Sequence, residues 1–191
     1  MAKETGKVKT EGKSLSIKSY PDLAAELKNG TVRGLYVLFG DEEYLIDRAV
    51  RAIERNLIAP GCEDADAYKG DFSLAGNTES LTEMLRTPPF LSTRRLVVLK
   101  NTGLFGAKSP ESPEAAAKYV SIFSSIPDFS CLVFVEEKID KRKKALLEAV
   151  SAAGVLVQVE KQSSDALCKW LAAQLGKRQI RITGEALSSL V

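Results

Sequence analysis

Residues 35–57 read LYVLFGDEEYLIDRAVRAIERNL, and this stretch decides the fold class. Its first five residues are apolar and end at Gly40, a pattern typical of a strand buried on both faces of a sheet. The remaining residues repeat apolar side chains at helical spacing, which predicts a helix with Asp41 as its N-cap. A buried strand followed at once by an amphipathic helix is the building unit of a parallel α/β sheet.

The same alternation continues along the chain. Four further apolar segments predict strands, a weak one at 67–69 and stronger ones at 96–99, 131–135 and 155–157. Helical patterns occupy the intervals between them, with Asn77 and Asp140 as N-caps of two of these helices. The pattern therefore predicts an α/β fold with a five-stranded parallel sheet, flanked by helices on both faces and connected by right-handed crossovers.

The strand pattern stops near residue 160. Beyond it, Ser164 is a candidate N-cap for a helix that carries Trp170 on its apolar face, and Thr183 with Gly184 begins a second helix. Trp170 is therefore expected in a core. We predict three regions along the chain: a disordered tail at 1–16, an α/β domain at 17–160 and a truncated helical domain at 161–191.

Composition excludes several classes of enzyme. The 191 residues include 27 basic and 25 acidic side chains, and the net charge of +2 gives no global sign of nucleic-acid binding. No histidine is present, which excludes Ser-His-Asp catalysis, histidine general bases and zinc sites that contain histidine. The three cysteines lie far apart and form no CxxC motif, a usage that fits a reducing cytosol better than a zinc ribbon or a disulfide framework.

The turn at Gly40 lacks the residues of a phosphate-binding loop. Such a loop needs GxxxxGK[ST], whereas here three carboxylates follow the glycine, Asp41, Glu42 and Glu43. They suit a helix N-terminus but repel a phosphate. The pair Glu136 and Glu137 after the strand 131–135 resembles an acidic Mg²⁺ site, but without a phosphate loop the pattern favours solvated carboxylates. An ATP- or GTP-hydrolysing protein with an atypical phosphate site stays open as an alternative.

The segment before the strand 96–99 reads TPPFLSTRR over residues 87–95. Pro88 and Pro89 cannot extend a helix or serve in a central strand, so Phe90 and Leu91 fall on a connection. Two interpretations stay open. Phe90 packs back onto the core, which local pattern alone slightly favours, or it is exposed and docks a partner.

A basic cluster, KIDKRKK at residues 138–144, precedes the last predicted helix of the sheet domain. Cations at a helix N-terminus oppose the helix dipole, so they are not placed there for helix stability. Four of them are candidate DNA contacts, Lys141, Arg142, Lys143 and Lys144. A solvated surface is the alternative that the pattern favours.

Four segments in this order resemble a known family: YVLFGDEEYLIDRAV, RTPPFLSTRRLVVLK, LVFVEEKIDKRKKALLEAV and WLAAQLGKRQIRITGEALSSLV. Together, over residues 17–191, they resemble the N-terminal part of the δ subunit of the bacterial DNA polymerase III clamp loader. The resemblance implies an AAA+-type, P-loop NTPase-like sheet domain followed by the start of a small helical lid, without the collar domain of the full protein. It also implies no ATPase activity, no cofactor and no metal.

The partners that the resemblance implies are those of a replication complex. They are the β sliding clamp, the δ′ and γ/τ loader subunits in the full-length protein, and primed DNA indirectly. The resemblance implies that the full protein is a component of the DNA polymerase III holoenzyme, a DNA-directed DNA polymerase complex. A cytoplasmic location at the bacterial replisome, with no membrane contact, follows from the same resemblance.

The resemblance also implies a role for Phe90. In the family, an apolar pair before the third strand, commonly leucine then phenylalanine, plugs a hydrophobic pocket on the clamp and favours the opened clamp interface. Phe90 matches the phenylalanine, but Pro89 stands where the leucine is expected, and Leu91 or Met84 would supply the missing aliphatic contact. The implied function is a non-catalytic subunit that binds and opens the clamp. An ATP-hydrolysing protein and a DNA-binding module stay open as alternatives.

Overall fold

The computed structural model describes residues 15–70, 77–107, 112–161, 168, 171–172, 175–176 and 179–189. The predicted tail lies outside this range except for its last two residues, and the predictions for Ser164 and Trp170 lie outside it as well. The chain divides into two compact units, Met1–Val159 and Glu160–Val191. In the second unit, α9 (Gly184–Ser189) begins as expected, with the Thr183 hydroxyl accepting a hydrogen bond from the Ala186 N–H.

Among its described residues, the first unit is built on a parallel sheet of six strands in the order β1-β6-β2-β5-β4-β3. The strands are β1 (Ile17–Ser19), β2 (Leu35–Phe39), β3 (Ala67–Gly70), β4 (Arg95–Lys100), β5 (Ser130–Glu136) and β6 (Val155–Gln158). The five predicted strands are all present, but the predicted strand count is wrong. The sixth strand, β1, has only three residues and lies at the edge of the sheet, where it pairs with β6.

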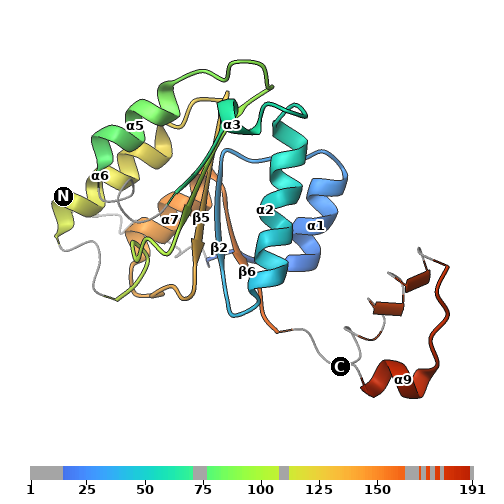
Figure 1. Ribbon diagram of the computed structural model, residues 1–191. Helices are drawn as coiled ribbons and strands as arrows, with labels where there is room; N and C mark the ends of the chain where they lie inside the picture. Colours follow the sequence, from blue (N-terminus) through green and yellow to red (C-terminus); the bar gives the residue numbers. More distant parts are fainter. Residues whose placement is uncertain are drawn as a thin grey trace, which may run out of the picture. The chain divides into compact units, whose positions relative to one another are not determined.

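Helices cover both faces of this sheet (Figure 1). The buried apolar side chains form two cores, one on each face of the sheet. The first core contains apolar residues of α1 (Tyr20–Lys28) and α2 (Glu43–Leu57). The second core contains apolar residues of α5 (Thr78–Arg86), α6 (Pro113–Ser124) and α7 (Lys144–Ala153). Residues of β2 alternate between the two cores because successive side chains of a strand point to opposite faces: Tyr36 and Leu38 face one, Leu35 and Val37 the other.

Two predicted N-caps are wrong and one is confirmed. Helix α2 begins at Glu43 with Glu42 at the N-cap position, so Asp41 does not cap it. Helix α7 begins at Lys144, and the Asp140 carboxylate instead accepts the Arg142 N–H in a turn before the helix. The side chain of Asn77 accepts a hydrogen bond of 3.1 Å from the Ser80 N–H at the start of α5, as predicted.

A short helix, α3 (Glu63–Asp66), connects the segment after α2 to β3. Figure 1 shows α3 at the same end of the sheet as the segment that joins α5 to β4. This is the amino end of the parallel strands, and the turn after β2 lies at the opposite, carboxyl end. Within the described part of the chain, no helix is long and apolar enough to cross a membrane.

Candidate protein-interaction site

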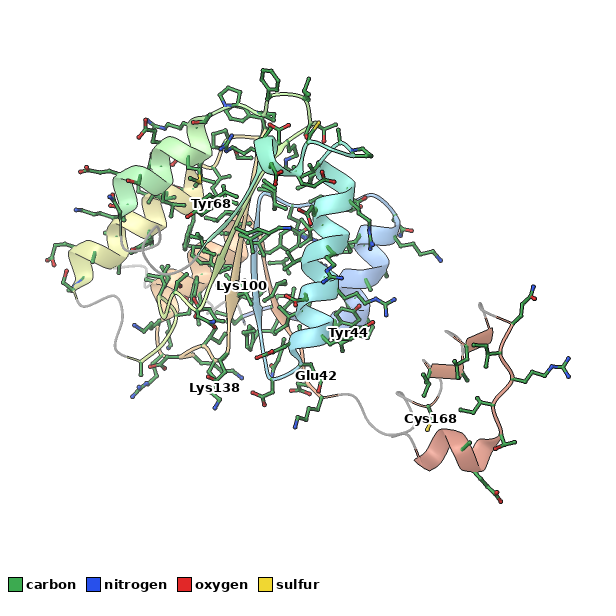
Figure 2. All side chains as sticks on the ribbon, in the orientation of Figure 1. Glu42, Tyr44, Tyr68, Lys100, Lys138 and Cys168 are labelled. Atoms are coloured by element: carbon green, nitrogen blue, oxygen red, sulfur yellow. The ribbon has the colours of Figure 1, made fainter. Side chains whose placement is uncertain are left out.

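The carboxyl end of the sheet is where open parallel α/β folds bind their ligands. A cavity of about 630 Å³ lies there. Acidic side chains dominate its lining, and they are Asp41, Glu43, Asp47, Glu136 and Glu137. The cation in the lining is Lys100, whose Nζ lies 2.8 Å from Asp47 Oδ1. Figure 2 shows Glu42 and Lys138 at this same end. The charges of this cavity oppose the binding of a nucleotide phosphate.

Gly40, in the turn after β2, has a packing role at this end. Its φ is +142°, and a Cβ atom on it would lie 2.0 Å from the Val159 carbonyl oxygen. The backbone of Val159 passes close to the turn because its N–H donates to the Phe39 carbonyl, at 2.8 Å. A glycine is therefore required here whether or not a phosphate binds nearby.

Glu136 holds a neighbouring loop. The side chain is 5% exposed, so the interpretation as a solvated carboxylate is wrong for Glu136, and burial raises its pKa. One carboxylate oxygen accepts a hydrogen bond from the Thr102 hydroxyl, and the other accepts one of 3.1 Å from the Gly103 N–H. Glu137, in contrast, pairs with Lys138 at 3.1 Å. The two glutamates thus have separate partners, and the described residues contain no cluster of three or more His, Cys, Asp or Glu placed to hold a metal.

The amino end of the sheet carries an apolar loop, which we define as residues 87–94, between α5 and β4. Phe90 is 79% exposed and Leu91 66%, the highest fractions among the large exposed apolar side chains of the described residues. The interpretation in which Phe90 packs back onto the core is therefore wrong. Pro89 is half-buried. Met84 is also half-buried and packs against the second core, so Leu91 is the exposed aliphatic neighbour of Phe90.

A buried carboxylate holds the centre of the apolar loop. Asp66, the last residue of α3, is 0% exposed. It accepts hydrogen bonds from three consecutive backbone N–H groups, those of Phe90 at 2.5 Å, Leu91 at 3.0 Å and Ser92 at 2.8 Å. These donors, led by the Phe90 N–H, hold the pKa of Asp66 well below its usual range. Nothing in the local sequence EDAD marks this aspartate among its acidic neighbours.

The last residues of the apolar loop are tied to the rest of the domain. The Ser92 hydroxyl accepts a hydrogen bond of 3.1 Å from the Ala59 N–H, and the Thr93 hydroxyl donates one of 2.9 Å to the Leu57 carbonyl. Arg94 donates to the carbonyls of Val32, at 3.2 Å, and Ser130, at 2.5 Å. The loop is thus attached to the end of α2, to the segment before β2 and to β5.

The basic cluster is less available than its sequence suggests. Arg142 forms an ion pair of 2.8 Å with Asp140 and lowers the pKa of that carboxyl to about 2. Lys143 is half-buried, and burial lowers its pKa. Lys141 and Lys144 are exposed. Arg142 is exposed as well, but its charge is paired with the Asp140 carboxylate.

A parallel sheet with helices on both faces and a cavity at its carboxyl end defines an open α/β domain. The family model described as DNA polymerase III, delta subunit, matches residues 36–160, more than half of the chain. The chain belongs to this family of clamp-loader proteins of DNA replication, and the resemblance identified in the sequence is confirmed. The α/β, AAA+-type fold class is confirmed too, apart from the strand count.

Two relatives from Bacillus subtilis match this chain. The DNA polymerase III subunit delta of strain 168 is 29% identical over 127 residues, which cover 64% of this chain and 36% of the relative. The solved structure of a DNA clamp loader delta protein matches with a TM-score of 0.67 and 25% identity, covering 90% of this chain and 51% of that one. The chain thus spans between about a third and a half of the length of these relatives.

A more distant likeness bears on the fold alone. The structure of AMPPCP-bound DnaA from Aquifex aeolicus matches with a TM-score of 0.50 and 11% identity, covering 90% of this chain and 54% of that one. DnaA and this chain therefore share the arrangement of sheet and helices. Residue roles do not transfer at this identity.

Proposed function

We propose that this chain is a non-catalytic clamp-loader subunit that binds the sliding clamp through its apolar loop and promotes opening of the clamp. The observation that carries the proposal is the exposure of Phe90 and Leu91, at 79% and 66%, side by side on a loop whose backbone is hydrogen-bonded to the domain. Adjacent exposed apolar side chains of this size mark a site where another protein docks. Membership of the clamp-loader family supplies the partner.

Within the loop, Phe90 is the anchor and Leu91 is its aliphatic neighbour. An aromatic side chain that fills a pocket at the centre of an interface is the usual form of a binding hot spot. Pro89 limits the backbone before the anchor because its ring fixes φ. Met84 supports the second core behind the loop. The order in this chain is thus aromatic then aliphatic, the reverse of the leucine–phenylalanine order expected from the resemblance.

We also propose that this domain does not hydrolyse ATP. The acidic lining of the cavity at the carboxyl end supports this, since carboxylates repel phosphate and Lys100 is paired with Asp47. Calorimetry with ATP and Mg²⁺ tests it, and a measurable heat of binding would contradict it. The δ′ and γ/τ subunits, primed DNA and a cytoplasmic location belong to the proposal for the whole protein. DNA binding by this chain alone has weaker support because Arg142 is engaged with Asp140.

The experiment that tests clamp binding is a titration of the purified sliding clamp with the wild-type chain and with Phe90→Ala. We expect the substitution to cost about 2 to 4 kcal/mol of binding free energy, the range for a central anchor. The matched control is Tyr44→Ala, which removes another exposed aromatic side chain, 59% exposed, in the first turn of α2 at the carboxyl end. The control is expected to bind as the wild type does. Equal affinities for Phe90→Ala and the wild type would remove the anchor assignment.

A further inference from the structure

Asp66 is an acidic side chain with no exposed surface, and its hydrogen-bond partners lie 24 to 26 residues further along the chain. We propose that Asp66 is a positioning residue whose carboxylate fixes the backbone of residues 90–92, so that Phe90 and Leu91 stand in their clamp-binding orientation before the clamp arrives. The inference rests on the proposed function. It adds a residue that does not touch the clamp but acts through the two that do.

The first argument is the set of donors. Consecutive backbone N–H groups that converge on one point form a concavity suited to an anion, and here the chain supplies the anion itself. Pro88 and Pro89 have no backbone N–H. The donors begin with Phe90, the first residue after them, and continue through Leu91 and Ser92. Charge-assisted hydrogen bonds of this kind offset the cost of burying a carboxylate.

The second argument is the sheet register. Strand β3 begins directly after Asp66 and pairs in parallel with β4, with Ala67 opposite Leu96. Asp66 is therefore level with the start of β4, where the apolar loop enters the sheet. The close approach of the carboxylate to the loop follows from the pairing of two strands, and it does not depend on the clamp.

The third argument is what the contact does to the side chains. With the three N–H groups directed inward at Asp66, the side chains of Phe90 and Leu91 remain largely exposed. Binding then orders few additional groups, because the loop already has its conformation in the free protein. Preorganisation of this kind raises affinity by lowering the entropy lost on association.

The test compares Asp66→Asn with the wild type. Asparagine keeps the size of the side chain but removes the charge and offers one oxygen acceptor in place of two. The matched control is Glu136→Gln, which makes the same change in the buried carboxylate that holds residues 102–103 at the opposite end of the sheet. All variants are titrated against the purified sliding clamp below their unfolding temperatures, which thermal melts establish first.

We expect Asp66→Asn to bind the clamp about 10-fold more weakly, as for a loop that holds its binding conformation about a tenth of the time. Glu136→Gln is expected to bind as the wild type does. In a Phe90→Ala background the effect of Asp66→Asn is expected to shrink, because the two residues act through one contact. A general loss of stability would not produce this coupling.

The outcomes separate the two proposals. If Phe90→Ala weakens binding and Asp66→Asn does not, the positioning role is overturned and the proposed function stands. If Phe90→Ala also binds as the wild type does, the proposed function fails. If Asp66→Asn does not fold, the positioning role is tested instead by amide hydrogen exchange of the free wild-type chain. Protected amides at Phe90, Leu91 and Ser92 support the inference, and exchange as fast as in an unstructured peptide overturns it.

Discussion

The two ends of the sheet each have a loop held by a buried carboxylate, but the two carboxylates lie in opposite environments. At the carboxyl end, Glu136 accepts from the Thr102 hydroxyl and the Gly103 N–H, and burial raises its pKa. At the amino end, Asp66 accepts from three backbone N–H groups, and these lower its pKa. Burial disfavours the charge of Glu136, whereas hydrogen bonding favours that of Asp66.

The surfaces that these loops adjoin differ as well. The cavity at the carboxyl end is lined by carboxylates, whereas the loop at the amino end exposes Phe90 and Leu91. The carboxyl end is where open parallel α/β folds bind their ligands, but here its charges oppose a phosphate. The feature that suits a protein partner lies at the other end. The proposed function thus rests on the local chemistry of the surface more than on the fold.

The largest expected effect comes from removing both apolar side chains of the amino end. The double variant Phe90→Ala, Leu91→Ala is expected to lose about 4 kcal/mol of clamp-binding free energy, because both the anchor and its neighbour are gone. Surface plasmon resonance with immobilised clamp measures it. Since both side chains are exposed in the free chain, the melting temperature is expected to stay close to that of the wild type. If this variant bound the clamp as tightly as the wild type does, the clamp-binding surface would have to lie elsewhere on the chain.

A change at the carboxyl end is expected to affect stability and leave binding intact. In Gly40→Ala the new Cβ would lie 2.0 Å from the Val159 carbonyl oxygen, on a residue with φ +142°. We expect a loss of about 3 kcal/mol in the free energy of unfolding, from steric overlap and backbone strain. Urea denaturation measures this loss. The folded fraction is expected to bind the clamp with wild-type affinity, and a weakened affinity would show that the two ends are coupled.

The smallest effect is a difference in acid sensitivity. The folded-state pKa of Asp66 is lowered, so its stabilisation is present above the unfolded pKa of about 3.9 and is lost as the pH falls below it. Glu136 has a raised pKa and acts in the opposite sense, since its ionisation costs stability above an unfolded pKa of about 4.3. As the pH falls from about 5 toward the lowered pKa of Asp66, Asp66→Asn is thus expected to flatten the loss of stability. Glu136→Gln is expected to steepen this loss as the pH falls from the raised pKa of Glu136 to about 4.

Urea denaturation at several pH values measures these slopes. Over the whole acid range, we expect Asp66→Asn to lose the least stability, Glu136→Gln to lose the most, and the wild type to lie between them. Identical slopes for Asp66→Asn and the wild type would mean that the Asp66 carboxylate has no special stabilisation in the folded chain, and the contrast between the two ends would then lose its electrostatic basis.

Much of the fold could be predicted because most of its strands coincide with local runs of apolar residues. β2 and β5 are buried along their whole length, which produces continuous hydrophobic segments. β1 could not be predicted in this way. It has three residues, IKS, and becomes a strand only through its pairing with β6. The cap predictions failed where the chain turns before its helix, at Asp41 and Asp140, because the spacing shows the helix but not the turn.

The candidate site was predictable only in part. The two prolines correctly placed Phe90 on a connection, but local pattern favoured its packing on the core, and its exposure is a property of the folded domain. The choice between Leu91 and Met84 could have been made from spacing. Met84 lies three residues after Leu81, on the helix face that packs inward. Asp66 could not have been found, since its contacts join segments 24 to 26 residues apart.

The central claim is that the partner binds at the amino end of the sheet. The most direct measurement is amide hydrogen exchange of the whole chain with and without the sliding clamp. We predict added protection in the apolar loop, residues 87–94, and no change at residues 40–43 and 136–140 of the carboxyl end. Protection confined to the carboxyl end, with the exchange of residues 90–92 unchanged by the clamp, would contradict the claim.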